Sequence, residues 1–249
     1  MATFTGEDDL ERAQFRGTSL RGARFVACDL SGVVARAVDL DGADLDSPWL
    51  MEGGASLTVN GVDVVPFIEA ELNRRFPGRE QRQAADPDGL RNAWAALERT
   101  WTTTMDRAAQ LPPGTVEVSV DGEWSFAQTL RHLVMATDTW LGKAVLELQS
   151  PYHPIGQPDA SFGDPSSVFD SGTPRYQDVL EVRAARQAMV RDFLATVTAG
   201  ELNAERRNPH APQYPETVLS CLHTILEEEW AHHQYAVRDL TAIENDGAR

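Results

Sequence analysis

The sequence is poor in cysteine and in basic residues, and it has no long apolar run. Its two cysteines, Cys28 and Cys221, lie in dissimilar segments, so we expect neither a disulfide framework nor a cysteine-based metal site. Twenty-two basic against 38 acidic residues give a formal charge of -16, which disfavours direct nucleic-acid binding. No uncharged apolar segment reaches the roughly 18 residues of a membrane helix, and residues 1–10 lack a signal-peptide pattern. These absences predict a cytoplasmic protein without nucleic-acid or membrane partners.

A five-residue repeat occupies the first part of the chain. From Asp8 the units are DDLER, AQFRG, TSLRG, ARFVA, CDLSG, VVARA, VDLDG and ADLDS, with Leu or Phe at the centre of seven. This period fits neither a helix nor a strand, so it indicates a coil that turns a corner in every unit. The pattern resembles the pentapeptide-repeat family, which implies a short right-handed β-helix over residues 1–48 with inward-pointing central side chains. Eight units make about two coils, little more than the minimum for one coil to cover another.

The five-residue period ends after Pro48, and residues 49–89 are predicted to be a linker with one short helix. Pro66 is expected to begin this amphipathic helix, Pro66–Phe76, and Pro77-Gly78 to end it.

Residues 90–249 contain four patterns of helical period, which predict a four-helix bundle. The expected helices cover Leu90 to Met105, Ser125 to about Gln149, Tyr176 to Gly200, and about Pro215 to Ile243. Ser125 and Gln128 form a capping box at the second start, and alternating valines over residues 116–120 predict a short extended piece before it. Residues 150–174 have many Pro and Gly but no period, which favours a long crossover between parallel neighbours.

The last of these helices carries the most informative polar residues. Glu229 and His233 fall within roughly 20° of the centre of its apolar stripe at about 100° per residue, so both are predicted to point into the core. A buried carboxylate needs a cation or a basic partner, and one metal ion satisfies both residues. The neighbours Glu227, Glu228, His223 and His232 lie off that stripe and are expected to be solvated or to support the site. A charged Glu229–His233 pair within the helix is an equally weighted alternative.

Two motifs together indicate a family. WSFAQTLRHL at residues 124–133 and EEWAHHQYAVRDL at residues 228–240 resemble signatures of the DinB-like superfamily, whose bundles have a long connection between the second and third helices and hold a divalent metal. The resemblance places the metal ligands on His132, Glu229 and His233, and the His, Glu, His order is more similar to the mycothiol-dependent maleylpyruvate isomerase branch. His132 lies well away from the centre of its own helix's apolar stripe, so periodicity alone does not select it. Zn²⁺ is favoured for these N and O ligands, and Ni²⁺, Fe²⁺ or Mn²⁺ also fit.

The resemblance implies a thiol S-transferase that uses mycothiol or a similar small thiol against a small electrophile. Arg238 is a candidate contact for the carboxylate of that thiol, and its alternative is a structural pair with Asp239. Two other hypotheses remain open. One is a metal-dependent hydrolase of a small amide or ester with Glu228 or His232 as proton relay, and the other is a non-enzymatic metal-binding scaffold. A homodimer is expected because bundles of this family often pair through their helices.

Overall fold

The computed structural model describes residues 3–51, 54–159, 162 and 165–247. The chain forms two compact units, Met1–Asp46 and Ser47–Arg249, and residues 49–89 therefore group with the bundle. Parts of the predicted linker and crossover, at residues 52–53, 160–161 and 163–164, lie outside the described residues.

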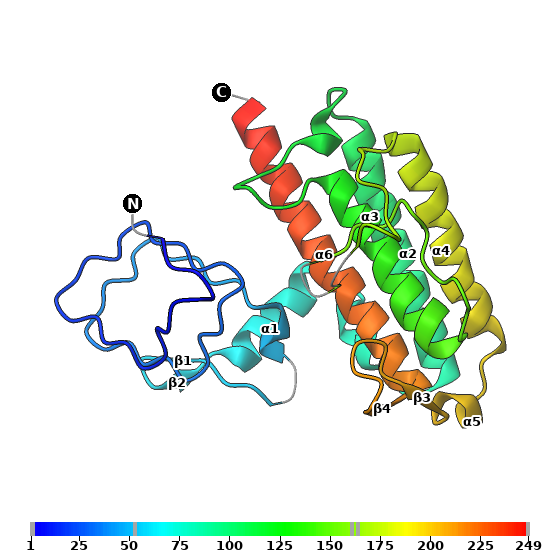
Figure 1. Cartoon of the computed structure of the whole chain (residues 1–249), viewed down its shortest axis with the longest axis horizontal. Coiled ribbons are helices and arrows are strands. Elements are labelled where there is room, and N and C mark those ends of the chain that lie inside the picture. The colour runs from blue at the N-terminus through cyan, green and yellow to red at the C-terminus, as the bar shows by residue number, and fades with distance from the viewer. Residues whose placement is uncertain (1–2, 52–53, 160–161, 163–164, 248–249) are drawn as a thin grey trace. The chain divides into compact units, whose positions relative to one another are not determined.

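The backbone of the first unit repeats every five residues. A left-handed residue occurs at every fifth position, at Arg12, Gly17, Gly22, Ala27, Gly32, Ala37 and Gly42. At alternate corners the amide three residues after Leu10, Leu20, Leu30 or Leu40 donates a hydrogen bond to the carbonyl of that leucine. The chain therefore turns once per unit, as the period predicts (Figure 1).

The predicted β-helix is not confirmed in this unit. The described residues 3–46 contain no strand, and the backbone hydrogen bonds found among them are local turns. The central leucines and phenylalanines are 43% to 70% exposed rather than buried inside the coil. Two coils give each coil a neighbour on one side only, so eight units are too few to enclose the interior.

The second unit begins with short elements before the bundle. A 3-10 helix (Pro48–Met51) and a two-stranded hairpin of β1 (Thr58–Val59) and β2 (Val62–Asp63) precede α1 (Val65–Arg75). The predicted linker helix is thus present, with Pro66 in its first turn. A second 3-10 helix (Arg79–Gln83) leads into the bundle.

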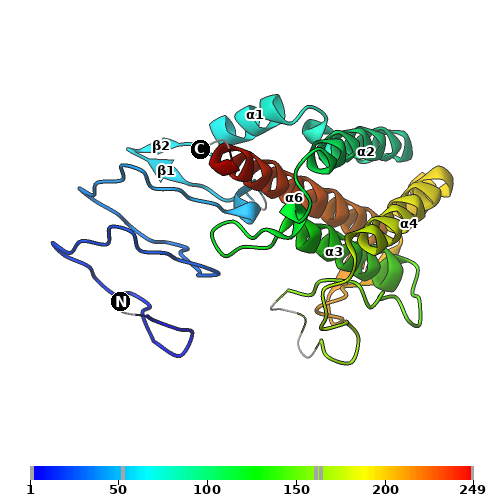
Figure 2. The same ribbon diagram turned by 90° about the horizontal axis from the view of Figure 1, so that it is seen from above.

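Four long helices form the bundle (Figure 1). They are α2 (Pro87–Ala109), α3 (Phe126–Thr137), α4 (Tyr176–Thr196) and α6 (Val218–Gly247), and α3 continues as a π-helix over Asp138–Val145. Helices α2 and α3 each pack against both α4 and α6, so α4 and α6 occupy opposite corners (Figure 2). Figure 1 shows that α3 and α4 run in the same direction, which explains the long connection between them. None of the described helices combines the length and apolar character that a membrane span requires.

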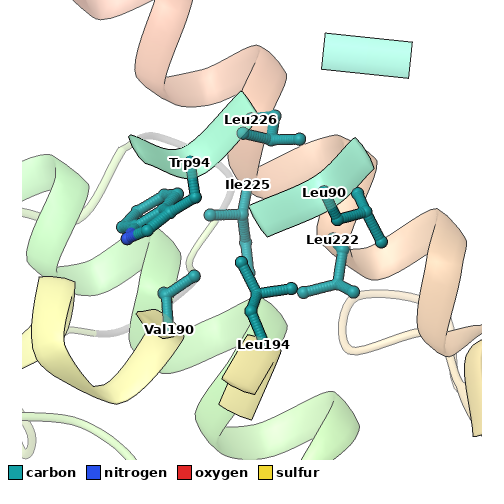
Figure 3. A pocket seen from close by; sticks show the side chains of 7 residues that line it. All are labelled: Leu90, Trp94, Val190, Leu194, Leu222, Ile225 and Leu226. Carbon is teal, nitrogen blue, oxygen red and sulfur yellow. The ribbon is translucent and has the colours of Figure 1, made fainter. Parts of the chain in front are cut away.

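The core is hydrocarbon at the end of the bundle where α2, α4 and α6 meet. A cavity of about 10 Å³ remains there (Figure 3), lined by Leu90, Trp94, Val190, Leu194, Leu222, Ile225 and Leu226. A space of this size barely holds one water, and an apolar lining offers that water no hydrogen bond. The predicted apolar faces of the first and fourth helices therefore meet as a close-packed core.

Four local predictions are wrong. Residues 115–117 form a 3-10 helix instead of an extended piece, because Val118 N–H closes a turn onto the Thr115 carbonyl. The second helix ends in the π-helix at Val145, short of Gln149. The fourth helix begins at Val218, because β4 (Pro215–Thr217) pairs antiparallel with β3 (Glu205–Arg207), and the third ends at Thr196, followed by the short helix α5 (Ala199–Leu202).

Candidate metal centre

Three side chains with metal-binding atoms converge between α3 and α6. The Ser125 hydroxyl and the Gln128 amide cap the start of α3, and His132 follows about two turns later on the face toward α6. Glu228 and His232 are one turn apart on α6. One ligand atom from each of His132, Glu228 and His232 lies within 4.8 Å of the other two.

The Glu228 carboxylate contacts both imidazoles. Its Oε2 is 3.4 Å from His132 Nε2 and 3.4 Å from His232 Nδ1. The two imidazole rings are stacked with centroids 4.6 Å apart. His132 is buried, whereas Glu228 and His232 are half-buried.

Backbone carbonyls set the tautomers of both histidines. His132 Nδ1 lies 3.2 Å from the carbonyl oxygen of Gln157, in the crossover, and His232 Nδ1 lies 2.9 Å from that of Glu228. A carbonyl only accepts, so each Nδ1 carries the proton in these bonds. A neutral ring that donates from Nδ1 carries its lone pair on Nε2, which is the arrangement by which proteins orient histidine ligands. The Nε2 atom of His132 faces Glu228 Oε2.

The structure places the predicted pair Glu229 and His233 elsewhere. Glu229 accepts hydrogen bonds from Arg183 Nη2 on α4 at 2.6 and 2.5 Å, and both side chains are 1% exposed. His233 Nε2 lies 2.8 Å from the Thr104 hydroxyl on α2. The predicted set of His132, Glu229 and His233 is therefore not brought together in the described residues; only His132 joins the cluster.

The different placement of the two pairs has a physical cause. The apolar stripe of α6 faces the bundle centre, where Arg183 satisfies the carboxylate of Glu229, so no metal is needed there. The cluster lies instead at the α3–α6 contact, about 100° further around the helix, where Glu228 and His232 were expected to be solvated or supporting. The sequence does contain a signal for Glu228 and His232. His132 lies off the centre of the apolar stripe of its own helix, so side chains that meet it should lie off the centre of the α6 stripe as well.

Comparison with known proteins identifies the helical part of the chain. A family model described as the DinB superfamily matches residues 96–236, more than half of the chain. The chain belongs to the DinB superfamily. A second model, for pentapeptide repeats, matches eight copies over residues 9–46. No curated protein and no solved structure gave a significant match.

DinB superfamily members commonly bind metal, and the chemistry of this cluster fits such an ion. Two imidazole nitrogens and one carboxylate oxygen are the ligand types of catalytic zinc sites, which keep further positions open. The surroundings also favour a neutral His232 and an ionised Glu228, the states in which these two side chains bind a metal. Burial lowers the pKa of His232 to about 4, assisted by the charge of His132. Burial alone would raise the pKa of Glu228, but the hydrogen bond and charge of His132 and the charge of His232 outweigh it and lower the pKa.

Aromatic and charged side chains border the DinB site. The Trp124 ring lies 4.7 Å from that of His132 and 6.2 Å from that of His232, centroid to centroid. Arg238 donates to Asp239 at 2.7 Å and to Glu123 at 2.6 Å, and this second contact ties the turn before Trp124 to α6. The Arg238–Asp239 pair is therefore present, and a carboxylate ligand would have to compete with these two side chains for the guanidinium.

Proposed function

We propose that this protein is a metal-dependent thiol S-transferase that joins a low-molecular-weight thiol, such as mycothiol, to a small electrophile. The convergence of His132, Glu228 and His232 from two adjacent helices carries the proposal. Zn²⁺ is the favoured ion, with Ni²⁺, Fe²⁺ and Mn²⁺ as alternatives for the same N and O ligands. The ligand set replaces the one predicted from sequence, because Glu229 is already paired with Arg183.

A bound metal ion with an open position lowers the pKa of a coordinated thiol, so that the nucleophilic thiolate is present at neutral pH. The residues of the chain hold and orient the site. The contact between His132 Nδ1 and the Gln157 carbonyl directs the opposite nitrogen, Nε2, toward Glu228, where it would coordinate the ion. Glu228 supplies the one negative charge among the three groups, and Trp124 shields the imidazole faces from water.

Arg238 is the candidate contact for a carboxylate of the thiol. It lies 5.2 Å from the Tyr235 ring centroid, and Tyr235 in turn contacts His232 edge to face at 5.7 Å. An anionic group that displaces Glu123 from Arg238 would therefore be held near the site. A homodimer remains our expectation for the assembly, and light scattering of the purified chain tests it directly.

The hydrolase hypothesis is the weaker of the two enzyme hypotheses. It requires a proton relay beside the metal, and both candidates for that relay, Glu228 and His232, belong to the ligand set. The scaffold hypothesis requires no open metal position. Thiol titration distinguishes the hydrolase and scaffold hypotheses from the transferase, because only the transferase requires a thiol to bind the metal.

The deciding experiment measures metal content by plasma mass spectrometry on the wild-type chain and on His132→Ala, Glu228→Ala and His232→Ala. We expect about one metal ion per wild-type chain and a loss of at least tenfold in affinity in each variant. Co²⁺-loaded protein is then titrated with mycothiol and with simpler thiols. A sulfur-to-metal charge-transfer band is expected on thiol binding.

His223→Ala is the matched control, because it also removes an imidazole from α6, and His223 Nε2 contacts the Ala84 carbonyl rather than the three ligands. It should retain the metal. A chain that binds no metal under any loading condition would refute the proposal. A metal that is retained while no thiol perturbs its spectrum would leave the hydrolase or the scaffold.

A further inference from the structure

The ligand motif of α6 is ambiguous by one residue. The segment contains Glu227, Glu228 and Glu229 in succession and then His232 and His233. Glu228 with His232 and Glu229 with His233 have the same donor atoms and the same four-residue spacing. A rotation of α6 by about 100° would exchange one pair for the other opposite His132. Donor chemistry and spacing alone therefore do not decide which pair meets His132.

Glu229 is held from the opposite corner of the bundle. Arg183 on α4 reaches both of its carboxylate oxygens through Nη2, at 2.6 and 2.5 Å. Among the described residues, Nε and Nη1 of Arg183 find no hydrogen-bond partner, and the guanidinium lies 5.8 Å from the Trp101 ring centroid. Glu229 is thus the hydrogen-bonded counter-charge of this buried cation.

His233 is held from a second direction. Its Nε2 meets Thr104 on α2, and the rings of Trp101 and Phe76 approach it edge to face at 5.0 and 5.6 Å. Helix α6 is therefore fixed by polar contacts to both α4 and α2. A rotation that brought Glu229 toward His132 would break both contacts and leave the Arg183 charge buried without a counter-charge.

We propose that Arg183 and Glu229 are positioning residues whose buried ion pair sets the rotation of α6 and so selects Glu228 and His232 as the partners of His132. A buried ion pair adds little net stability over an apolar pair of similar size, but separating its members is strongly unfavourable. Such a pair is suited to excluding an alternative arrangement, as buried polar residues do for register in coiled coils. This inference rests on the proposed metal site.

The test uses the full chain with both charges removed, Arg183→Met with Glu229→Met, because a single replacement would strand a buried charge. The affinity for Co²⁺ is measured by competition with a chelator, and the geometry is followed by the visible spectrum of the bound ion. We expect the double variant to fold, as judged by circular dichroism, with affinity at least tenfold weaker and an altered spectrum. The control is Arg107→Met with Glu244→Met, which removes a 2.7 Å ion pair between α2 and α6 near the surface and should bind Co²⁺ as the wild type does.

A folded double variant with wild-type affinity and spectrum would overturn the inference and leave the proposed function intact. Failure of the wild-type chain to bind Co²⁺ would instead refute the proposed function. Should the double variant not fold, Arg183→Lys provides the same test with the buried charge retained, because an ammonium replaces the guanidinium that holds Glu229. A Co²⁺ affinity at least threefold weaker supports the inference, and wild-type affinity overturns it.

Discussion

Neighbouring residues of α6 have different roles because their partners differ. His232 Nδ1 lies 2.9 Å from the Glu228 carbonyl, and its side chain belongs to the candidate metal site. His233, one residue later, is enclosed by Phe76, Trp101 and Trp230 and reaches Thr104. The same residue type is thus a candidate ligand at one position and a core residue at the next.

The burial of His233 predicts an acid-sensitive stability. Burial lowers its pKa to about 4, below the 6.5 expected in the unfolded chain. The unfolded state therefore takes up the extra proton first, so this contribution to stability is complete above pH 6.5 and is lost as the pH falls toward 4. At about 1.4 kcal/mol per pH unit, the loss from this residue at pH 5 is about 2 kcal/mol.

Urea unfolding of the metal-free chain from pH 8 to pH 4.5 measures this effect. His233→Gln cannot titrate, so the free energy of unfolding of this variant should fall less steeply between pH 6.5 and 5 than that of the wild type. Parallel curves for the two proteins would show that His233 is not responsible.

Among the larger elements, the crossover between α3 and α4 does more than connect two parallel helices. Arg131 Nε donates to the Ile155 carbonyl at 2.8 Å, and the Arg131 carbonyl accepts from Gln157 N–H at 3.1 Å. Two residues before Ile155, His153 N–H donates to the buried carboxylate of Asp138 at 2.9 Å. These bonds hold the loop along α3 and bring the Gln157 carbonyl to His132.

Gly156 in this loop is tightly enclosed by neighbouring side chains. A Cβ atom there would come within 2.7 Å of the Phe169 ring and 3.2 Å of Met135. Gly156→Ala should therefore destabilise the fold by about 1 to 3 kcal/mol and weaken Zn²⁺ binding, because the Gln157 carbonyl is displaced. Gly172→Ala in the same connection meets nothing within 4 Å and serves as the control in thermal unfolding and Zn²⁺ titration. Equal behaviour of the two variants would mean that the loop does not support the site.

In the repeat, the strain lies at corners without glycine. Ala27 and Ala37 have φ values of 52° and 53°, where glycine at Gly22 and Gly32 adopts a similar backbone without cost. Replacing either alanine by glycine should stabilise the first unit by about 1 kcal/mol, seen as slower amide hydrogen exchange in residues 3–46. Ala23→Gly, at a position without positive φ, should not slow exchange.

The whole molecule consists of two units that differ in how much apolar surface they bury. The second unit has a continuous hydrophobic core with three fully buried tryptophans, Trp94, Trp101 and Trp230. In the described part of the first unit the central repeat side chains remain largely exposed. The candidate metal ligands all belong to the second unit.

Deletion of residues 1–46 therefore tests whether the second unit folds and binds metal without the repeat. We expect the remaining chain, Ser47–Arg249, to stay helical by circular dichroism and to bind Zn²⁺ with the affinity of the full chain, because its core and ligands are complete. Isothermal titration of both proteins makes the comparison. Loss of folding would give the repeat a structural role, and loss of metal binding alone would give it a role in the site.

Much of the fold was determined by local sequence. The four helical patterns, the capping box at Ser125 and the five-residue corners follow from side-chain period and turn chemistry, which act over a few residues. The start of α6 at Val218 did not follow, because a strand pairing at Pro215–Thr217 competes with helix extension. Both family resemblances were confirmed because their motifs are also local.

Tertiary structure decided which Glu and His pair of α6 faces His132. The sequence contains two equivalent Glu and His pairs on α6 and the single His132 on α3, and it shows that a carboxylate points into the core. It does not show that Arg183, 46 residues before Glu229, meets that carboxylate from the opposite corner. Charge neutralisation is a contact between distant segments, whereas helical period is a property of one segment. Packing therefore pairs Glu229 with Arg183 and leaves Glu228 and His232 to face His132.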